Sequence, residues 1–240
     1  MGNSQDTFKR VEKKYMLDTL QYSKLLEKLD GIMVEDAFGL HTIGNIYYDT
    51  EDYSLIRASI DKPVYKEKIR LRSYGKPRAD KKVFVELKKK YKGIVYKRRV
   101  QMTLREARDY LGPQRKHPEK TSQILKELDW TLDFYHPVPK VFIGYERSAF
   151  YCKENADLRI TFDTNLRWRT TLLDLEVGTW GSPLMEDGFV LMEIKIPGSI
   201  PLWLSRTLAE LRIYPKTFSK YGTCYEKYLI REMKEDRKYA

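Results

Sequence analysis

Apolar and charged residues alternate with a period of two through much of the chain, and this pattern predicts β-strands. The clearest case is "YKEKIRLRSYG" (65–75), in which every second position is basic: Lys66, Lys68, Arg70 and Arg72. Side chains on a strand alternate between two faces, so these cations share one face, while Ile69 and Leu71 lie on the other.

The same alternation predicts seven further strands. They lie at 8–16, 41–50, 81–91, 94–102, 140–151, 157–163 and 189–197, with a turn at 92–93 that joins two of them into a hairpin. Together with the first segment, this gives about eight strands.

Helical patterns separate some of these strands, at 18–31, 103–112, 121–130, 201–211 and 218–239. Their ends carry capping signals: Asp18 or Thr19 for the first helix, and Thr103 with Glu106 for the second. Short turns join most elements, and no strand–helix–strand repeat is present. The pattern therefore predicts one α+β domain, residues 1–240, with an antiparallel sheet or barrel. No P-loop or dinucleotide-binding glycine motif occurs.

The polar faces of these strands share one composition. The pattern E-x-K occurs at Glu12/Lys14, Glu86/Lys88 and Glu193/Lys195, and single arginines lie at Arg147 and Arg159. Like charges about 7 Å apart on one strand face repel by roughly 2 kcal/mol at an effective dielectric of about 20, against about 0.6 kcal/mol in water. A wet cavity that receives an anion fits these values better than a dry core does.

A closed antiparallel barrel satisfies this requirement. Its lumen takes the charged faces and its outer surface takes the apolar faces, with the helices packed outside. Arginine and lysine in such a lumen suit phosphate oxygens, and glutamates among them suit a divalent metal that bridges phosphates.

A simpler interpretation applies to each strand taken alone, because a half-exposed sheet normally shows its polar residues to water. Glu12 and Glu86 then form only cross-strand ion pairs. The basic residues near the 92–93 turn then form a solvated hairpin end, which can still steer a polyanion by its charge. They are Lys89, Lys90, Lys97, Arg98 and Arg99.

Composition supports a polyanionic partner, because the net charge is +11 and the sequence pI is near 9.4. Two distant cysteines and three scattered histidines match no zinc motif and fit a reducing, cytoplasmic setting. We expect no secretory leader, and no segment reaches the roughly 20 apolar residues of a membrane span.

Eight short segments in sequence order resemble the VTC domain of polyphosphate polymerases. They are "RVEKKYML", "NIYYDT", "KIRLRSYG", "VFVELKKK", "YERSAF", "LRITFD", "LMEIKI" and "KTFSKYG", and the similarity runs from about Phe8 to Tyr228. The VTC domain belongs to the triphosphate tunnel metalloenzymes, which include the CYTH-like triphosphatases and adenylate cyclases. The resemblance implies a tunnel of about eight antiparallel strands that binds triphosphate or polyphosphate and needs Mn²⁺ or Mg²⁺.

The resemblance also assigns site residues by position. The catalytic tunnel cations would be Lys14, Arg70, Arg72, Lys88, Arg147, Arg159 and Lys220. The substrate-binding residues would be Lys68, Lys195, Lys216 and Ser219. Glu193 would be the main metal ligand, with Glu12 and Glu86 contributing. The segment "PKTFSKYG" has one residue more than we expect between Lys216 and Phe218.

These residues favour a metal-dependent polyphosphate polymerase that transfers the γ-phosphate of ATP to a growing chain. A tunnel triphosphatase is the nearest alternative, and a non-catalytic polyanion-binding module is another. A nucleic-acid partner is not expected, because carboxylates share the faces of the cations. The resemblance leaves a membrane-protein partner open.

Overall fold

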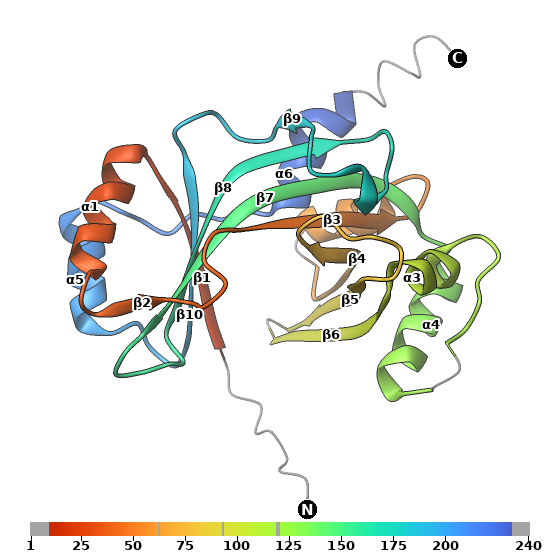
Figure 1. Ribbon diagram of the computed structural model, residues 1–240, viewed down its shortest axis with the longest axis horizontal. Coiled ribbons are helices and arrows are strands. Elements are labelled where there is room, and N and C mark those ends of the chain that lie inside the picture. The colour runs from red at the N-terminus through yellow and green to blue at the C-terminus, as the bar shows by residue number, and fades with distance from the viewer. Residues whose placement is uncertain (1–9, 62, 93, 119–120, 232–240) are drawn as a thin grey trace, which may run out of the picture. The chain divides into compact units, whose positions relative to one another are not determined.

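The structure, a computed structural model, describes residues 10–61, 63–92, 94–118 and 121–231. Its main feature is an antiparallel sheet with the strand order β1-β10-β8-β7-β3-β4-β5-β6 (Figure 1). The strands are β1 (Arg10–Leu17), β3 (His41–Asp49), β4 (Tyr65–Tyr74), β5 (Lys82–Tyr91), β6 (Ile94–Thr103), β7 (Val138–Cys152), β8 (Arg159–Arg169) and β10 (Val190–Pro197). Two short strands lie off this path: β2 (Met33–Glu35) pairs with β7, and β9 (Ser182–Pro183) pairs with β8.

The chain divides into two compact units that interleave in sequence. Unit 1 contains the described parts of residues 1–41, 146–165 and 185–218, and unit 2 contains those of 42–145, 166–184 and 219–240. The strands β7 and β8 each run through both units. The prediction of a single domain over 1–240 stays a prediction.

In unit 1, two helices cover the apolar face of β1, β10 and the first half of β8. They are α1 (Thr19–Leu29) and α5 (Leu202–Glu210), which lie side by side (Figure 1). Leu25 of α1 and Leu204 of α5 join one buried core with Met192 and Ile194 of β10 and Ile160 of β8. The polar face of these strands therefore lies on the side away from this core.

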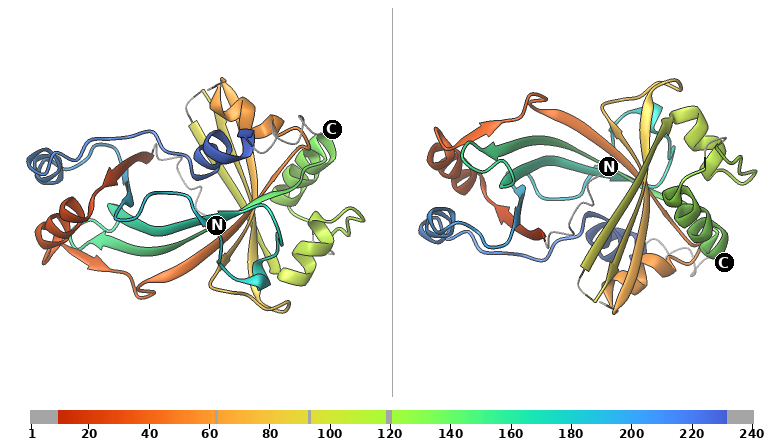
Figure 2. Two further views of the ribbon diagram at one scale, coloured as in Figure 1. Left: turned by 90° about the horizontal axis from the view of Figure 1, so that it is seen from above. Right: turned by 90° about the horizontal axis from the view of Figure 1, so that it is seen from below.

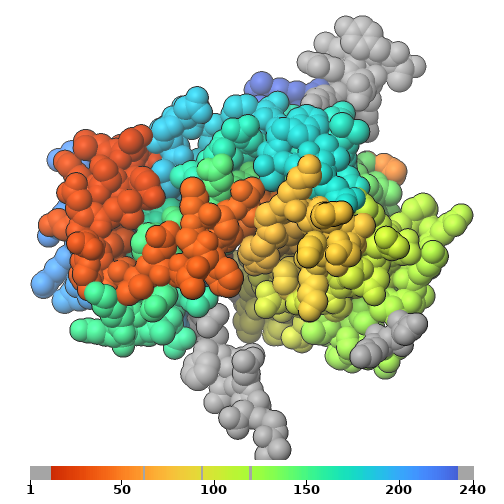
Figure 3. All heavy atoms as spheres, viewed as in Figure 1, coloured from red at the N-terminus to blue at the C-terminus, as the bar shows by residue number. Residues whose placement is uncertain are grey.

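In unit 2, α3 (Leu104–Leu111) and α4 (Gln123–Tyr135) pack on the apolar face of β4, β5 and β6. Leu71, Val85, Tyr110 and Leu128 belong to this core, and all are buried. The space-filling view shows the atoms from β4 (yellow) to α4 (yellow-green) closely packed (Figure 3). Because the apolar face is covered, the row of basic residues on β4 occupies the other face of the sheet.

Two shorter helices accompany β3 in unit 2. Views from above and below place α2 (Ser54–Ile60) beside α6 (Lys220–Cys224), in agreement with their contacts (Figure 2). A π-helical turn at Tyr225–Leu229 follows α6 directly. The predicted C-terminal helix is therefore confirmed only in its first part and changes its hydrogen-bonding pattern; its predicted end lies outside the described residues.

Local capping explains the helix starts that the sequence revealed. Asp18 accepts a hydrogen bond from the Gln21 backbone at 2.7 Å, and the Gln21 side chain accepts one from the Asp18 backbone. Thr103 and Glu106 form the same box at α3. Helix α2, β2, β9 and a 3₁₀ turn at Leu175–Val177 were not predicted, and β8 continues six residues beyond the predicted end at Asp163. The α+β class, with an antiparallel sheet of about eight strands and helices on its apolar face, is confirmed.

Candidate functional site

The polar face of β4 and β5 in unit 2 carries a four-residue ion cluster centred on Glu86. Arg70 is the direct cross-strand neighbour of Glu86, and its Nε and Nη2 both lie 2.6 Å from Glu86 Oε2. Arg72 Nε lies 3.7 Å from the same oxygen, and Lys97 Nζ of β6 lies 3.4 Å from Oε1. The side chain of Glu86 is only 2% exposed. One carboxylate therefore holds three cations on one sheet face.

This cluster changes the protonation of its members. Burial alone would raise the pKa of Glu86, but the charges of Arg70, Arg72 and Lys97 outweigh it and lower that pKa to about 2. Burial lowers the pKa of Lys97 to about 8; Arg70 and Arg72 add to this shift and Glu86 opposes it. The side chain of Lys97 is 48% exposed, so solvent reaches the ammonium group that these neighbours perturb.

Residues of β3 and β7 fix the orientation of the two arginines. Asn45 accepts a hydrogen bond from Arg72 Nε at 2.9 Å and donates one to the Ile143 carbonyl at 3.0 Å. Arg70 Nη1 donates to the Tyr47 hydroxyl at 3.3 Å. Arg72 Nη2 also donates to the Tyr145 hydroxyl at 3.5 Å, so contacts with neighbouring strands orient both guanidinium groups.

The start of α6 adds two predicted residues to unit 2. Ser219 caps α6, and its hydroxyl also accepts a hydrogen bond from Lys68 Nζ at 3.0 Å. Lys220 is buried, with its Nζ 4.3 Å from the centre of the Tyr145 ring. Lys68, Ser219 and Lys220 are therefore positioned by contacts within this unit.

Asp49 connects α6 to β3. Its carboxylate is fully buried and accepts hydrogen bonds from the backbone of Thr50, Leu55 and Ile56 and from the Tyr221 hydroxyl at 2.9 Å. The Tyr221 ring also stacks on Tyr47, with centroids 4.8 Å apart. Burial raises the pKa of Asp49, opposed by these hydrogen bonds, and burial together with Asp49 raises that of Tyr221.

The polar face of unit 1 carries a second cluster, centred on Glu193 of β10. Lys14, its direct cross-strand neighbour on β1, lies 3.3 Å from Oε1, and Lys195 lies 3.4 Å from Oε2. Lys14 also donates to the Phe218 carbonyl at 2.9 Å. The neighbour of Glu193 on β8 is Thr161, whose buried hydroxyl has no hydrogen-bond partner among the described residues.

Arg147 and Asp163 form a bidentate ion pair in unit 1. Arg147 Nε and Nη2 lie 2.5 and 2.7 Å from the two carboxylate oxygens of Asp163, which is fully buried. The sequence singled out Arg147 but did not identify this partner.

Four other predicted site residues are exposed. Glu12 and Arg159 both lie opposite Lys195 on neighbouring strands, and Lys88 lies opposite Lys68 and Lys97. The backbone of Lys216 donates to the Lys14 carbonyl at 2.8 Å, which places it beside β1. These exposed side chains border the two clusters, and their functional roles stay predictions.

A metal site made of protein ligands alone is not present in the part of the chain that the structure describes, where no three His, Cys, Asp or Glu residues come together. The donors around Glu193 nevertheless fit a different arrangement, because Mg²⁺ is often held by one or two carboxylates together with substrate phosphates. The unpartnered Thr161 hydroxyl beside Glu193 supports an additional polar species there. Glu86, by contrast, is surrounded by cations.

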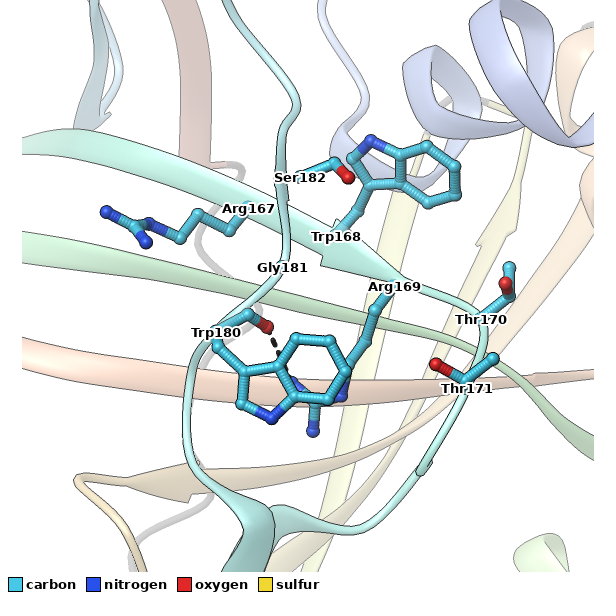
Figure 4. A pocket seen from close by; sticks show the side chains of 8 residues that line it. All are labelled: Arg167, Trp168, Arg169, Thr170, Thr171, Trp180, Gly181 and Ser182. Atoms are coloured by element: carbon cyan, nitrogen blue, oxygen red, sulfur yellow. Dashed lines mark hydrogen bonds between the residues drawn. The ribbon is translucent and has the colours of Figure 1, made fainter.

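Unit 2 also has a surface pocket of about 470 Å³ (Figure 4), and none of the residues that line it belongs to either charged cluster. Arg169, which lines it, donates to the backbone carbonyls of Leu172, Asp174, Gly178 and Trp180. Its guanidinium also lies 3.7 Å from the centre of the Phe142 ring. This arginine holds the surrounding loop together, and none of the eight lining residues is a predicted site residue.

Several residues of the clusters escaped the sequence analysis. Lys97 was assigned to the solvated hairpin end, although its register opposite Lys88 places it on the polar face of β5. Asn45, Tyr47 and Thr161 occupy alternate positions on the same faces as the charged residues opposite them, which are Arg72, Arg70 and Glu193. Assigning every second residue of each strand to the polar face would have identified these three uncharged residues, whereas a search for charged residues alone does not.

Two solved structures share this fold. A putative adenylate cyclase from Bacillus halodurans is 12% identical, with a TM-score of 0.55, over 88% of this chain and 93% of that one. A putative adenylyl cyclase from Hippeastrum, described as having a dominant triphosphatase activity, is 16% identical, with a TM-score of 0.51, over 89% and 93%. At these identities the likeness concerns the fold alone.

The sequence model of the VTC domain matches residues 9–229, and the chain therefore belongs to the VTC domain family. The resemblance noted in the sequence is confirmed by this match. A search of curated proteins gave no match. No helix in the described residues is long and apolar enough to cross a bilayer.

Proposed function

We propose that the protein is a metal-dependent polyphosphate polymerase that transfers the γ-phosphate of ATP to a growing polyphosphate chain. The supporting observation is the composition of the polar sheet faces. In each unit, cations from neighbouring strands surround one buried carboxylate, Glu86 or Glu193, on the face opposite the helix-covered core. Membership of the VTC domain family supports the same reaction.

The cations of these faces supply charge where the reaction needs it. A terminal phosphate oxygen of the chain attacks the γ-phosphorus, a new P–O bond forms, and the bond to the β–γ bridging oxygen breaks, so that ADP leaves. Both reactants are anions, and their repulsion opposes this approach. Arginines such as Arg70 and Arg72 offer paired N–H donors to phosphate oxygens, and Lys14 and Lys195 offer compact charges. Positioning and electrostatic stabilisation suffice, since the phosphates carry the reacting atoms.

Glu193 is the residue that would hold Mn²⁺ or Mg²⁺ in this proposal, with Glu12 bordering it across Lys195. A bound divalent cation would neutralise phosphate charge and act as a Lewis acid on the phosphoryl group. Lys14 and Lys195 orient the Glu193 carboxylate, because each lies within 3.4 Å of one of its oxygens. Glu86, held by three cations, serves to orient Arg70 and Arg72.

The test is to incubate the purified protein with ATP and Mn²⁺ or Mg²⁺, with and without a short polyphosphate primer. A polymer that stains as polyphosphate on a gel and is degraded by a polyphosphatase, formed together with ADP, supports the proposal. Absence of polymer from the wild-type protein across metals and primers removes it.

A tunnel triphosphatase is the second candidate, and the fold shared with the Hippeastrum protein favours it. The same residues would bind the substrate, and water would replace phosphate as the acceptor. Release of free phosphate from ATP or tripolyphosphate without polymer selects this reaction. Metal-independent binding of polyphosphate with no turnover selects the third alternative, a non-catalytic polyanion-binding module.

A further inference from the structure

The end of the β5–β6 hairpin in unit 2 exposes apolar side chains at the place where β4, β5 and β6 end together. Tyr65, Tyr91 and Ile94 form a row across the three strands, since Tyr91 is the direct neighbour of both others. Val64 and Val95 flank this row, and the Lys92 backbone donates to the Val64 carbonyl at 3.0 Å. We call these five residues the apolar tip. Their side chains are 41–62% exposed.

Basic residues surround the apolar tip. The segment 88–101 contains seven lysines and arginines and no acidic residue. Lys90 is the direct neighbour of both Val95 and Lys66, and Lys92 lies with its Nζ 5.4 Å from the centre of the Tyr91 ring. The tip therefore combines exposed aliphatic and aromatic side chains with a dense positive charge.

The surface continues from the tip onto α4 within the same unit. Lys89, opposite Tyr96, lies 5.8 Å from the centre of the Trp130 ring. Trp130 stacks on Phe134 with centroids 5.0 Å apart, and both rings are more than half exposed. Glu67 is buried beneath this surface and accepts a hydrogen bond from Tyr65, which fixes one tyrosine of the tip.

We infer that the apolar tip docks on the surface of a lipid bilayer that contains anionic lipids. We choose this partner because its charge is complementary to that of the tip: anionic headgroups attract lysines and arginines near a membrane surface. Tyrosine and tryptophan prefer the interface between headgroups and acyl chains, and long lysine side chains extend from apolar surroundings to the headgroups. The exposed Ile94 and Val95 at the hairpin end suit the apolar part of a bilayer interface, and they offer no ring on which the bases of a single-stranded nucleic acid could stack.

This inference concerns residues outside the proposed reaction centre. Ile94, Val95, Lys90 and Lys92 were not assigned to phosphate binding, so substitutions there test docking and leave the charged clusters intact. The experiment uses the full chain and vesicles of phosphatidylcholine with or without 30% phosphatidylserine. Binding is measured by co-sedimentation at several salt concentrations.

We expect the wild-type protein to bind the phosphatidylserine vesicles at least tenfold more tightly than the neutral ones, with weaker binding at higher salt. The double variant Ile94→Ser/Val95→Ser should reduce this binding at least tenfold. The double variant Lys90→Gln/Lys92→Gln should reduce the affinity for these vesicles by about fivefold for each lysine removed. Phe38→Ser, which removes a 78% exposed ring from unit 1, is the matched control and should bind as the wild type does.

A fluorescent label on Ile94→Cys reports insertion directly. Both native cysteines are buried, so labelling favours the new thiol. We expect brighter, blue-shifted emission with phosphatidylserine vesicles, and no change for the same label on Phe38→Cys.

The inference is overturned by an absence of vesicle binding by the wild type, by binding that the tip variants leave unchanged, or by tip-dependent self-association without vesicle binding. Tip-dependent binding to tRNA or to an acidic protein in place of vesicles also overturns it. Turnover of ATP without vesicles should be the same in Ile94→Ser/Val95→Ser and the wild type, so the outcome is independent of which reaction the charged clusters catalyse.

Discussion

Arg70 and Glu86 are direct cross-strand neighbours, and two guanidinium nitrogens of Arg70 lie 2.6 Å from one oxygen of Glu86. The same carboxylate also attracts Arg72 and Lys97. This one acidic group therefore allows three cations to share a sheet face. Replacing it should change both the stability of the protein and its response to a bound anion, and these two effects can be measured separately.

Glu86→Gln should destabilise the protein by about 3 kcal/mol, because it leaves partly buried cations without their counter-charge. Tripolyphosphate should then raise the melting temperature more in this variant than in the wild type, since the anion replaces the missing charge. Thermal denaturation with and without tripolyphosphate provides the measurement. Equal ligand-induced shifts in the two proteins would show that the cluster does not receive the anion.

The acid stability of the protein should depend on the same residue. The folded-state pKa of Glu86 is about 2, below its ordinary value of 4.5, so its stabilising contribution is complete above about pH 4.5. That contribution, at most about 3 kcal/mol, is lost as the pH falls towards 2. Urea denaturation between pH 5 and 2 should show a steeper loss of stability in the wild type than in Glu86→Gln.

Substrate binding should weaken above about pH 8, because the pKa of Lys97 is lowered to about 8 and its loss of charge removes one cation from the site. The decline should appear in kcat/KM, which reports the free enzyme. Lys97→Arg keeps its charge and should abolish the decline. Lys28→Arg, on the exposed surface of α1, serves as the control and should retain the wild-type pH profile.

Glu193→Gln should lower kcat/KM for ATP by about 100-fold or more, because it removes the carboxylate proposed to hold the metal. Binding of polyphosphate should persist, since Lys14 and Lys195 remain. Isothermal titration with polyphosphate separates the two effects. Glu210→Gln removes an exposed carboxylate of α5 and should behave as the wild type. Wild-type turnover by Glu193→Gln would exclude this residue as the metal ligand.

Tyr221→Phe should cost about 1–3 kcal/mol of stability, because the buried carboxylate of Asp49 loses one of its donors while the ring stacking on Tyr47 is kept. Urea denaturation measures the loss, and Tyr214→Phe, at an exposed position, should show none. If Asp49 also positions α6, KM should rise in Tyr221→Phe because Ser219 and Lys220 begin that helix.

The alternation of apolar and charged residues in β4 and in the first half of β5, together with the turn at 92–93, predicted the β4–β5–β6 meander almost to the residue. It missed the end of β8, where "TNLRW" interrupts the alternation after Asp163. It also missed α2, because Tyr53 precedes that helix in a left-handed conformation without a side-chain cap. The carboxylate that accepts hydrogen bonds from the first turn of α2 belongs to Asp49, at the end of β3.

Site residues could be predicted where charged residues occupy alternate positions along a strand, as Arg70, Arg72 and Glu193 do. Partners that depend on the pairing of distant strands could not. Asp163 is the clearest example, since its pairing with Arg147 depends on the approach of β7 and β8. Lys97 was missed because a basic hairpin end has the same composition whether its side chains face water or a neighbouring carboxylate.

The pairing of β1 with β10 joins the first and one of the last strands of the described chain. A ribosome adds about 5–20 residues per second, so β1 waits on the order of 10–40 s for its partner to be synthesised. During that interval Tyr15 and Leu17, which are buried in the finished protein, lack the strand that covers them. The nascent protein therefore passes through a stage in which this N-terminal segment exposes apolar side chains, and slower translation would lengthen that stage.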